Sequence, residues 1–322
     1  MTKIIFKLLR DAFITIKIKY QSNKGLNSIS DFKYFFQLFI IRFFFGNTKI
    51  RNLIKANKFN EEVWSSIFIT PESSKNILKE LVNDGCSYVL KLKDDNFEDI
   101  KNETLLNMQC PNAIFFDGKN KLLNKQNFFD LPSLENFLVQ NNIYMLKNEL
   151  VINNLLKFKE LFTNNFFLNI AQNYFGSKKI TVSASIFSTN NSAQNKLSED
   201  SRKALKHKSA QSYHFDVDFK KFFKIIIYFT DVESELDGAH IFIPGTHIKK
   251  HSNHYVTDRF SDDDIERSYD RKKTFTGKAG SLFFVDTFGI HKGSTVEKNF
   301  RTAVLVEYGK DHFQYSKNAI FI

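Results

Sequence analysis

The chain has 322 residues, of which 42% are hydrophobic, enough to form a core and to exclude a wholly disordered chain. Its two cysteines, Cys86 and Cys110, are too few for a disulfide scaffold, a zinc finger or an iron–sulfur site, so we expect an intracellular protein with reduced thiols. The net charge of +11 favours anionic partners. Lysine is scattered along the chain and nucleic-acid-binding motifs are absent, so specific nucleic-acid binding is not predicted.

Residues 1–60 are predicted to form a basic, phenylalanine-rich helical extension. Apolar residues of Met1–Tyr20 follow one face of a helix, and the charges among them argue against a signal peptide. The apolar segment Phe32–Phe45 is shorter than the roughly 20 residues that a membrane crossing needs. Two interpretations stay open: packing on the body of the protein, or peripheral contact of residues 1–45 with an anionic membrane. The expected location is the cytoplasm, in the second case at the inner face of a membrane.

Residues 61–178 are predicted to be a helical layer that supports the rest of the chain. The sequence Pro71-Glu72-Ser73-Ser74 is typical of a helix start, and Asp84-Gly85 of a helix end. Further helices are expected over 133–139, 150–162 and 164–174, and a short strand over 87–92. This part carries no obvious catalytic constellation.

From Lys179 onward the pattern changes to short strands separated by Gly, Asp and Lys turns. Strands are predicted over 180–187, 222–229, 239–243, 280–285 and 302–307. Because no long helices intervene, the fold class is expected to be mainly β, a sandwich or jelly roll behind a helical N-terminal layer.

The most specific chemical feature is His214-Phe215-Asp216. Residues i and i+2 of a strand share a face, so the imidazole and the carboxylate should lie side by side. These are two of the three ligands of a 2-His-1-carboxylate facial triad, which leaves metal positions open. His291 follows a predicted strand, and in a jelly roll it could converge with the first two. Arg301, at the start of the next strand, could hold a carboxylate through two hydrogen bonds.

These motifs, together with the stretch from Asp237 to His247, resemble the phytanoyl-CoA dioxygenase family over residues 179–309. The resemblance implies an iron(II)- and 2-oxoglutarate-dependent dioxygenase, with O2 as co-substrate, on a double-stranded β-helix (a cupin-like jelly roll). Residues 61–322 would then be one oxygenase domain, with helical support over 61–178 and a jelly-roll core over 179–309.

Carried over residue by residue, the resemblance assigns the iron to His214, Asp216 and His291. It assigns the distal carboxylate of 2-oxoglutarate to Arg301, and we add Ser294 and Thr295 as further candidate contacts because their hydroxyls closely follow His291. Other co-substrate contacts are expected within 180–211. His247 closes a structural Pro-Gly-Thr-His turn and is not expected to bind iron.

The remaining polar residues have ordinary interpretations. His207, His240 and His312 are predicted to be surface or sheet residues. The run of His247, His251 and His254 has the spacing of a zinc site, but a solvated loop is favoured. Asp218 could orient a ligand histidine, although a strand-end carboxylate is favoured. The charged interval 249–275 is expected to be a lid or insertion beside the site, and both cysteines are expected to be structural.

The function expected from these features is hydroxylation of a C–H bond in a small-molecule substrate. The positive charge favours an anionic metabolite, an acyl thioester or a glycan intermediate, and the sequence does not choose among them. The filled carboxylate position at Asp216 argues against a halogenase. The alternative is a non-catalytic or differently metallated jelly-roll binding protein, either of which could be membrane-peripheral.

Overall fold

The computed structural model describes residues 62–109, 111–192, 197–216, 218–251, 254, 259–298, 300–312 and 318–322. The predictions for residues 1–60 and for Cys110 lie outside this part. None of the helices in the described part has the length and hydropathy that a bilayer crossing requires.

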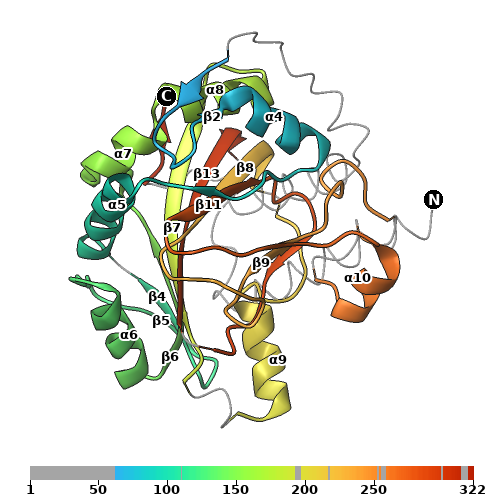
Figure 1. Ribbon diagram of the computed structural model, residues 1–322. Helices are drawn as coiled ribbons and strands as arrows, with labels where there is room; N and C mark the ends of the chain where they lie inside the picture. The colour runs from blue at the N-terminus through green and yellow to red at the C-terminus, as the bar shows by residue number, and fades with distance from the viewer. Residues whose placement is uncertain are drawn as a thin grey trace, which may run out of the picture.

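Two antiparallel sheets form the centre of the molecule (Figure 1). The large sheet has the order β3-β11-β8-β13-β7-β6-β4-β5, and β14 also pairs with β7. Its strands are β3 (Leu90–Lys91), β4 (Asn112–Phe115), β5 (Asn120–Leu122), β6 (Ile143–Glu149), β7 (Thr181–Asn190), β8 (Phe219–Tyr228), β11 (Ser281–Val285), β13 (Phe300–His312) and β14 (Ile320–Phe321). The small sheet has the order β10-β9-β12, with strands β9 (His240–Phe242), β10 (Lys273–Phe275) and β12 (His291–Gly293). A two-stranded sheet joins β1 (Trp64–Ser65) to β2 (Glu72–Ser73).

The connections show that the core is a jelly roll. From β7 onward the chain passes to the segment around His214, which pairs with His291 of β12, and then back to β8 in the large sheet. It next forms β9 and β10 in the small sheet, β11 in the large, β12 in the small and β13 in the large. This exchange between two facing antiparallel sheets confirms the predicted fold class.

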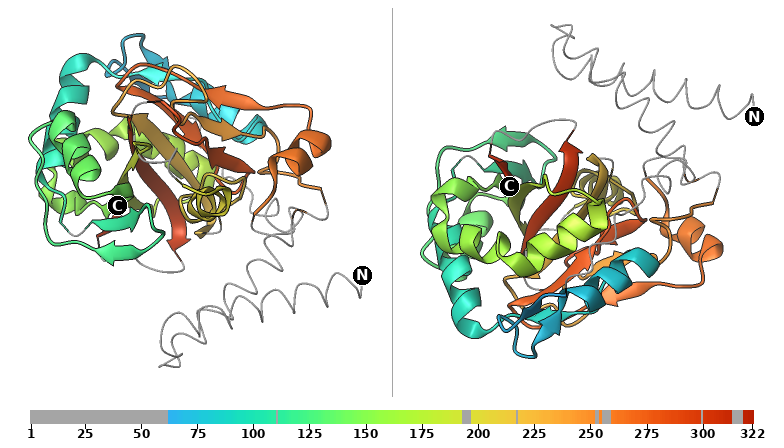
Figure 2. Two further views of the ribbon diagram at one scale, coloured as in Figure 1. Left: turned by 90° about the horizontal axis from the view of Figure 1, so that it is seen from below. Right: turned by 90° about the horizontal axis from the view of Figure 1, so that it is seen from above.

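Helices cover the outer face of the large sheet (Figures 1 and 2). They are α4 (Ser74–Asn83), α5 (Asp94–Leu106), α6 (Leu131–Gln140), α7 (Leu156–Phe162) and α8 (Asn165–Phe175). The ends of α8 follow from its sequence. The side chain of Asn164 accepts hydrogen bonds from the amides of Phe166 and Phe167 at the first turn, and Gly176 takes the left-handed conformation with φ 60° at the end. Two more helices, α9 (Glu199–Lys208) and α10 (Asp262–Ser268), lie outside this layer (Figure 1).

The strand β8 is buried on both faces of the large sheet, which explains its unbroken apolar run. Ile225 and Ile227 face the helices and join the largest core cluster. Ile226 and Tyr228 face the small sheet and pack with Phe242 and neighbouring apolar residues inside the jelly roll. A strand covered on both faces reads as continuously apolar rather than alternating.

Several local predictions differ from the structure. The helix expected over 150–162 is a short 3-10 turn, Ile152–Asn154, followed by α7, and the strand expected over 87–92 shrinks to Leu90–Lys91. The helical layer also contributes β4, β5 and β6, which widen the large sheet. Of these strands β6 pairs with β7, and β4 pairs with β6 and β5. A local sequence pattern does not reveal such pairing between strands.

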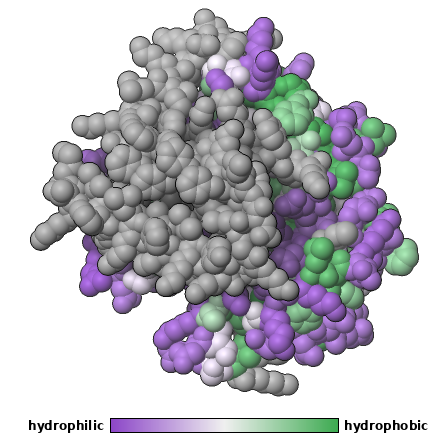
Figure 3. Space-filling view, turned by 180° about the vertical axis from the view of Figure 1, so that it is seen from behind, coloured by the Kyte–Doolittle hydropathy of each residue, from purple (hydrophilic) through white to green (hydrophobic). Residues whose placement is uncertain are grey.

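Where the face in Figure 3 is described, several separate apolar areas lie between polar residues. The large apolar side chains that remain exposed include Trp64, Ile69, Phe129 and Leu156, which belong to different elements. Apolar residues scattered singly over a surface are normal and need no partner to explain them.

Candidate metal centre

Three side chains that could bind a metal ion come together between the two sheets. One potential ligand atom each from His214, Asp216 and His291 lies within 4.8 Å of the other two. The Nε2 atom of His214 is 3.7 Å from one Asp216 oxygen, and the Nε2 atom of His291 is 3.6 Å from the other. Among the described residues this is the one cluster of three or more His, Cys, Asp or Glu with such spacing. Two neutral imidazoles and a carboxylate suit a divalent transition metal.

The backbone fixes both imidazole rings. The Nδ1 of His214 lies 2.9 Å from the carbonyl oxygen of Ser212, and the Nδ1 of His291 lies 3.0 Å from that of Gly289. A carbonyl oxygen only accepts, so each Nδ1 carries the proton and each Nε2 keeps its lone pair toward the centre of the cluster. The ring orientation is therefore set without a metal ion.

Backbone hydrogen bonds hold the two ligand segments together. The amides of His214 and His291 each donate to the other residue's carbonyl oxygen, at 2.9 and 2.8 Å. The amide of Asp216 donates to the carbonyl oxygen of Thr287 at 2.8 Å. The H-x-D motif is thus paired, residue against residue, with the segment that carries the second histidine.

Electrostatics keep the three groups in the protonation states that a metal ion needs. Burial, and then the neighbouring His291, lower the pKa of His214 to about 3, and burial also lowers the pKa of His291. Burial opposes the charge of Asp216, but Lys224 and the two histidines outweigh it and hold the pKa of that carboxyl well below its usual range. At neutral pH the cluster is two neutral imidazoles and one carboxylate.

The Pro-Gly-Thr-His turn supports this cluster from outside. The hydroxyl of Thr246 donates to the carbonyl oxygen of Ile243 at 2.6 Å and accepts from the amide of Ile290, next to His291, at 2.8 Å. His247 is buried and faces away from the cluster, with its Nε2 3.2 Å from the carbonyl oxygen of Val82 in α4. In the structure, the turn joins α4 to the segment that carries His291.

Arg301 lies at the start of β13 in a space that two glycines leave open. A Cβ atom on Gly293 would come within 3.1 Å of its Nη1, and one on Gly238 within 3.1 Å of its Cδ. Its Nη1 donates to the carbonyl oxygen of Gly238, while its Nε is buried without a hydrogen-bond partner among the described residues. The guanidinium therefore keeps donor capacity inside the protein.

Other buried polar atoms near Arg301 also lack partners in the described part of the chain. Thr189 is the cross-strand neighbour of Arg301, and its hydroxyl is unpaired. His240 faces Gly293 across the small sheet, stacks on His291 with ring centroids 5.3 Å apart, and has an unpaired Nε2. The Nε2 of Gln211 and the hydroxyl of Ser294 complete this set, which we call the polar row: Thr189, Gln211, His240, Ser294 and Arg301.

The polar row differs in part from the sequence predictions. His240 was expected to be an ordinary surface or sheet residue. It does lie in the strand β9, but only 7% of it is exposed and it packs against the candidate ligand His291. Burial, and then His291 and Arg301, lower its pKa well below the ordinary value, so it is neutral. Within 180–211, Thr189 is the cross-strand partner of Arg301. Gln211 follows Ala210, whose carbonyl oxygen accepts from the amide of Gly293 beside Arg301. Thr295 is half-buried, and its predicted role stays a prediction.

Lys224 of β8 lies directly behind Asp216. Its Nζ is 2.9 Å from Asp216 Oδ2, 2.8 Å from Asp218 and 2.9 Å from Glu307, and only 12% of its side chain is exposed. Burial opposes its charge, but the three carboxylates raise the pKa of Lys224 well above its usual range. Asp218 immediately precedes β8, so it is a strand-end carboxylate as favoured, and it is also part of this ion-pair network. Burial raises the pKa of Glu307, and the neighbouring Lys224 opposes that rise.

The His247, His251, His254 run does not gather around a metal position. His254 is buried, with its Nδ1 2.9 Å from the Tyr269 hydroxyl and its Nε2 2.9 Å from Asp264. Both ring nitrogens are thus engaged by protein groups. The expectation of a solvated loop is wrong for His247 and His254, which are both buried, whereas His251 is exposed. The contacts of His254 help to fix α10 beside the core.

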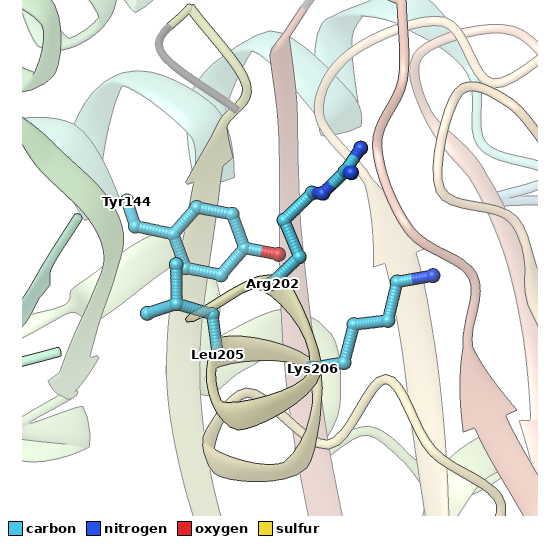
Figure 4. Close-up of a pocket in the computed structure, with 4 residues that line it drawn as sticks. All are labelled: Tyr144, Arg202, Leu205 and Lys206. Atoms are coloured by element: carbon cyan, nitrogen blue, oxygen red, sulfur yellow. The ribbon is translucent and has the colours of Figure 1, made fainter. Parts of the chain in front are cut away.

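A shallow pocket lies beside α9 and is lined by Tyr144, Arg202, Leu205 and Lys206 (Figure 4). The two basic side chains extend to the same side as the Tyr144 hydroxyl (Figure 4). That hydroxyl donates to Gln211 Oε1 at 2.7 Å, which links the pocket wall to the polar row. Two positively charged side chains therefore line this pocket.

No protein-family model matches the chain, and no curated protein matches it in sequence. Among solved structures it is similar to the non-heme alpha ketoglutarate dependent carbocyclase SnoK from nogalamycin biosynthesis, at 11% identity and a TM-score of 0.46, over 79% of this chain and 99% of that one. It is also similar to the epimerase SnoN from the same biosynthesis, at 12% identity and a TM-score of 0.44, over 73% and 82%. HygX from Streptomyces hygroscopicus, solved with iron bound, matches at 11% identity and a TM-score of 0.43, over 72% and 85%. Because these identities and TM-scores are low, no property of the three proteins is transferred to this chain.

Proposed function

We propose that this protein is an iron(II)- and 2-oxoglutarate-dependent oxygenase that oxidises a C–H bond of a small molecule. The observation that carries the proposal is the pairing of two sites inside one jelly roll. One is the His214, Asp216 and His291 cluster, and the other is Arg301 with the polar row beside it. A metal ion alone would not require the second site.

The residues present fit the metal. The two Nε2 lone pairs and one Asp216 oxygen would hold Fe(II), and three protein ligands leave positions for other ligands. When bound, iron with 2-oxoglutarate and O2 supplies the oxidising chemistry, and the protein supplies position and exclusion of water. The backbone contacts of both Nδ1 atoms support this role, because they aim both imidazoles before any metal arrives.

The residues beside Arg301 fit a dicarboxylate. An unpaired buried polar atom costs about 1–3 kcal/mol, so several of them in one place favour a polar ligand or ordered water there. The Arg301 Nε, the Gln211 amide and the Thr189 and Ser294 hydroxyls are donors that suit a carboxylate. The glycines at 238 and 293 leave the space that Arg301 occupies.

An anionic substrate suits the charge around this site. Arg202 and Lys206 extend beside the pocket next to the polar row (Figure 4), and the chain carries a net charge of +11. The proposed substrate is of this class: a small anionic metabolite, acyl thioester or glycan intermediate. The assignment to the phytanoyl-CoA dioxygenase family, and hydroxylation as the outcome, stay predictions.

The test is an anaerobic titration of metal-free protein with Fe(II) and then with 2-oxoglutarate. We expect a visible metal-to-ligand charge-transfer band in the wild-type protein and none in His291→Ala. Arg301→Ala should need about 10- to 100-fold more 2-oxoglutarate, because hydrogen bonds to a charged group contribute about 1.5–3 kcal/mol.

Two exposed residues provide matched controls, His207→Ala in α9 and Arg267→Ala in α10, and both should titrate like the wild type. Folded wild-type protein that binds Fe(II) but gives no band with 2-oxoglutarate would refute the proposal. Tight binding of another metal without a response to 2-oxoglutarate would favour a differently metallated binding protein.

A further inference from the structure

Among the described lysines and arginines, Lys224 forms an ion pair with the candidate metal ligand Asp216, and its ammonium group is held in one position. Three carboxylates contact its Nζ at 2.8–2.9 Å. Glu307 is its direct cross-strand partner on β13, and Asp218 immediately precedes β8. An ammonium group has three N–H donors, and here each faces a different carboxylate.

This arrangement makes the two oxygens of Asp216 unequal. Oδ2 accepts a charge-assisted hydrogen bond from Lys224, whereas no protein donor within hydrogen-bond distance is seen for Oδ1 among the described residues. A divalent cation bound by both oxygens would also lie closer to the ammonium, and like charges at such short range repel strongly. Both effects favour metal binding through one oxygen.

We propose that Lys224 is a positioning residue that restricts Asp216 to binding the metal through a single oxygen. This inference rests on the proposed function. A carboxylate that bound through both oxygens would occupy one of the coordination positions that the facial triad leaves open. Lys224 thereby keeps those positions available for 2-oxoglutarate and O2.

If Lys224 had a purely structural role, the expected result would be different. If Lys224 served only as the counter-ion of Glu307 and Asp218, its loss would lower stability and leave the coordination mode of Asp216 unchanged. If it restricts Asp216, its loss changes how the carboxylate binds the metal, and removal of a nearby positive charge does not weaken metal binding.

The experiment measures carboxylate coordination directly by infrared difference spectroscopy on protein labelled with 13C-aspartate, with and without Zn(II). A carboxylate bound through one oxygen has a wider separation between its antisymmetric and symmetric stretches than one bound through both. We expect the wide separation in the wild type and a narrow one in Lys224→Met. Lys224→Arg, which keeps the charge and the donors, should restore the wide separation.

The matched control is Lys221→Met, because Lys221 lies on the same strand but on its opposite face, over the ring of Tyr174. It should match the wild type. In Fe(II) titrations, Lys224→Met should bind metal at least as tightly as the wild type and need at least about 10-fold more 2-oxoglutarate.

Two results would overturn the inference: a narrow separation in the wild type, or a wide one in folded Lys224→Met. If Lys224→Met does not fold, the double variant Lys224→Met with Glu307→Gln removes the buried unpaired carboxylate and answers the same question. These results can be distinguished from failure of the proposed function. In that case the wild-type protein would give no charge-transfer band with 2-oxoglutarate, whatever the infrared result.

Discussion

The buried Nε2 of His240 lies beside the candidate metal ligand His291 and has no hydrogen-bond partner among the described residues. Both ring nitrogens of His254 contact protein groups, and the Nδ1 atoms of His214 and His291 face carbonyl oxygens. The Nε2 of His240 is buried between His291 and two phenylalanine rings without a partner among the described residues. A buried polar atom of this kind indicates a partner that is not part of the chain.

We therefore expect His240→Leu to weaken 2-oxoglutarate binding about 10-fold while Fe(II) binding stays within about 2-fold of the wild type. Leucine has a comparable volume, so the packing on Phe275 and Phe283 is largely kept. The measurement is the concentration of 2-oxoglutarate that gives half of the charge-transfer band. Equal half-saturation in the two proteins would indicate that the Nε2 of His240 pairs with a water molecule and not with 2-oxoglutarate.

At the scale of elements, the C-terminus of α4 joins two segments that lead to the candidate ligands. The carbonyl oxygen of Asp84 accepts from the amide of Gly245, and that of Gly85 accepts from the amide of Asp286. Gly85 has φ +80°, and the His247 ring packs on the place where a Cβ would be. A helix far from the metal cluster in the sequence thus holds the turn 244–247 and the segment before His291.

This contact gives a prediction with an internal control. Gly85→Ala would place its Cβ 2.4 Å from His247 Nδ1, whereas Gly118→Ala, at the nearly identical φ of +79°, meets only Lys208 Nζ at 3.7 Å. Both variants lose about 1–2 kcal/mol of unfolding free energy, because alanine is strained in the left-handed backbone conformation. We expect Gly85→Ala to lose about 1–3 kcal/mol more of unfolding free energy, because only it creates a clash in a packed region. Urea denaturation measures both, and equal losses would show that His247 moves aside without cost.

At the scale of the whole molecule, the buried imidazoles make stability depend on pH. The pKa of His214 falls from 6.5 to about 3, because burial and then His291 disfavour its cation. Between these values the unfolded chain binds a proton that the folded chain does not, so the unfolding free energy decreases as pH falls below about 6.5. The slope from this residue is at most about 1.4 kcal/mol per pH unit.

Urea denaturation of metal-free protein between pH 7 and pH 4.5 tests this dependence. The midpoint should fall with pH in the wild type, and His214→Gln should have a shallower dependence because its side chain does not titrate. His207→Gln, on the exposed surface of α9, should keep the wild-type slope. Identical slopes for wild type and His214→Gln would contradict the assignment.

The sequence allowed prediction of those parts of the fold and site that depend on short-range patterns. Strand periodicity placed His214 and Asp216 on one face, and the motif order indicated the jelly roll that the structure confirms. Lys224 was missed because the sequence does not show whether a lysine within an apolar strand is exposed or forms a buried ion pair. Its partner Glu307 can be identified only from the register of β8 with β13. His240 was missed because a lone histidine in a strand has no sequence signal for the ring it stacks on.

The large sheet also has a consequence for how the molecules behave in concentrated solution. One of its outer strands, β3, has two residues, and the other, β5, has three residues that are all exposed, with Lys121 in the middle. A short outer strand with a charged side chain offers few backbone groups in a row to a strand of another molecule. At both described ends, this wide sheet is thereby protected against edge-to-edge aggregation.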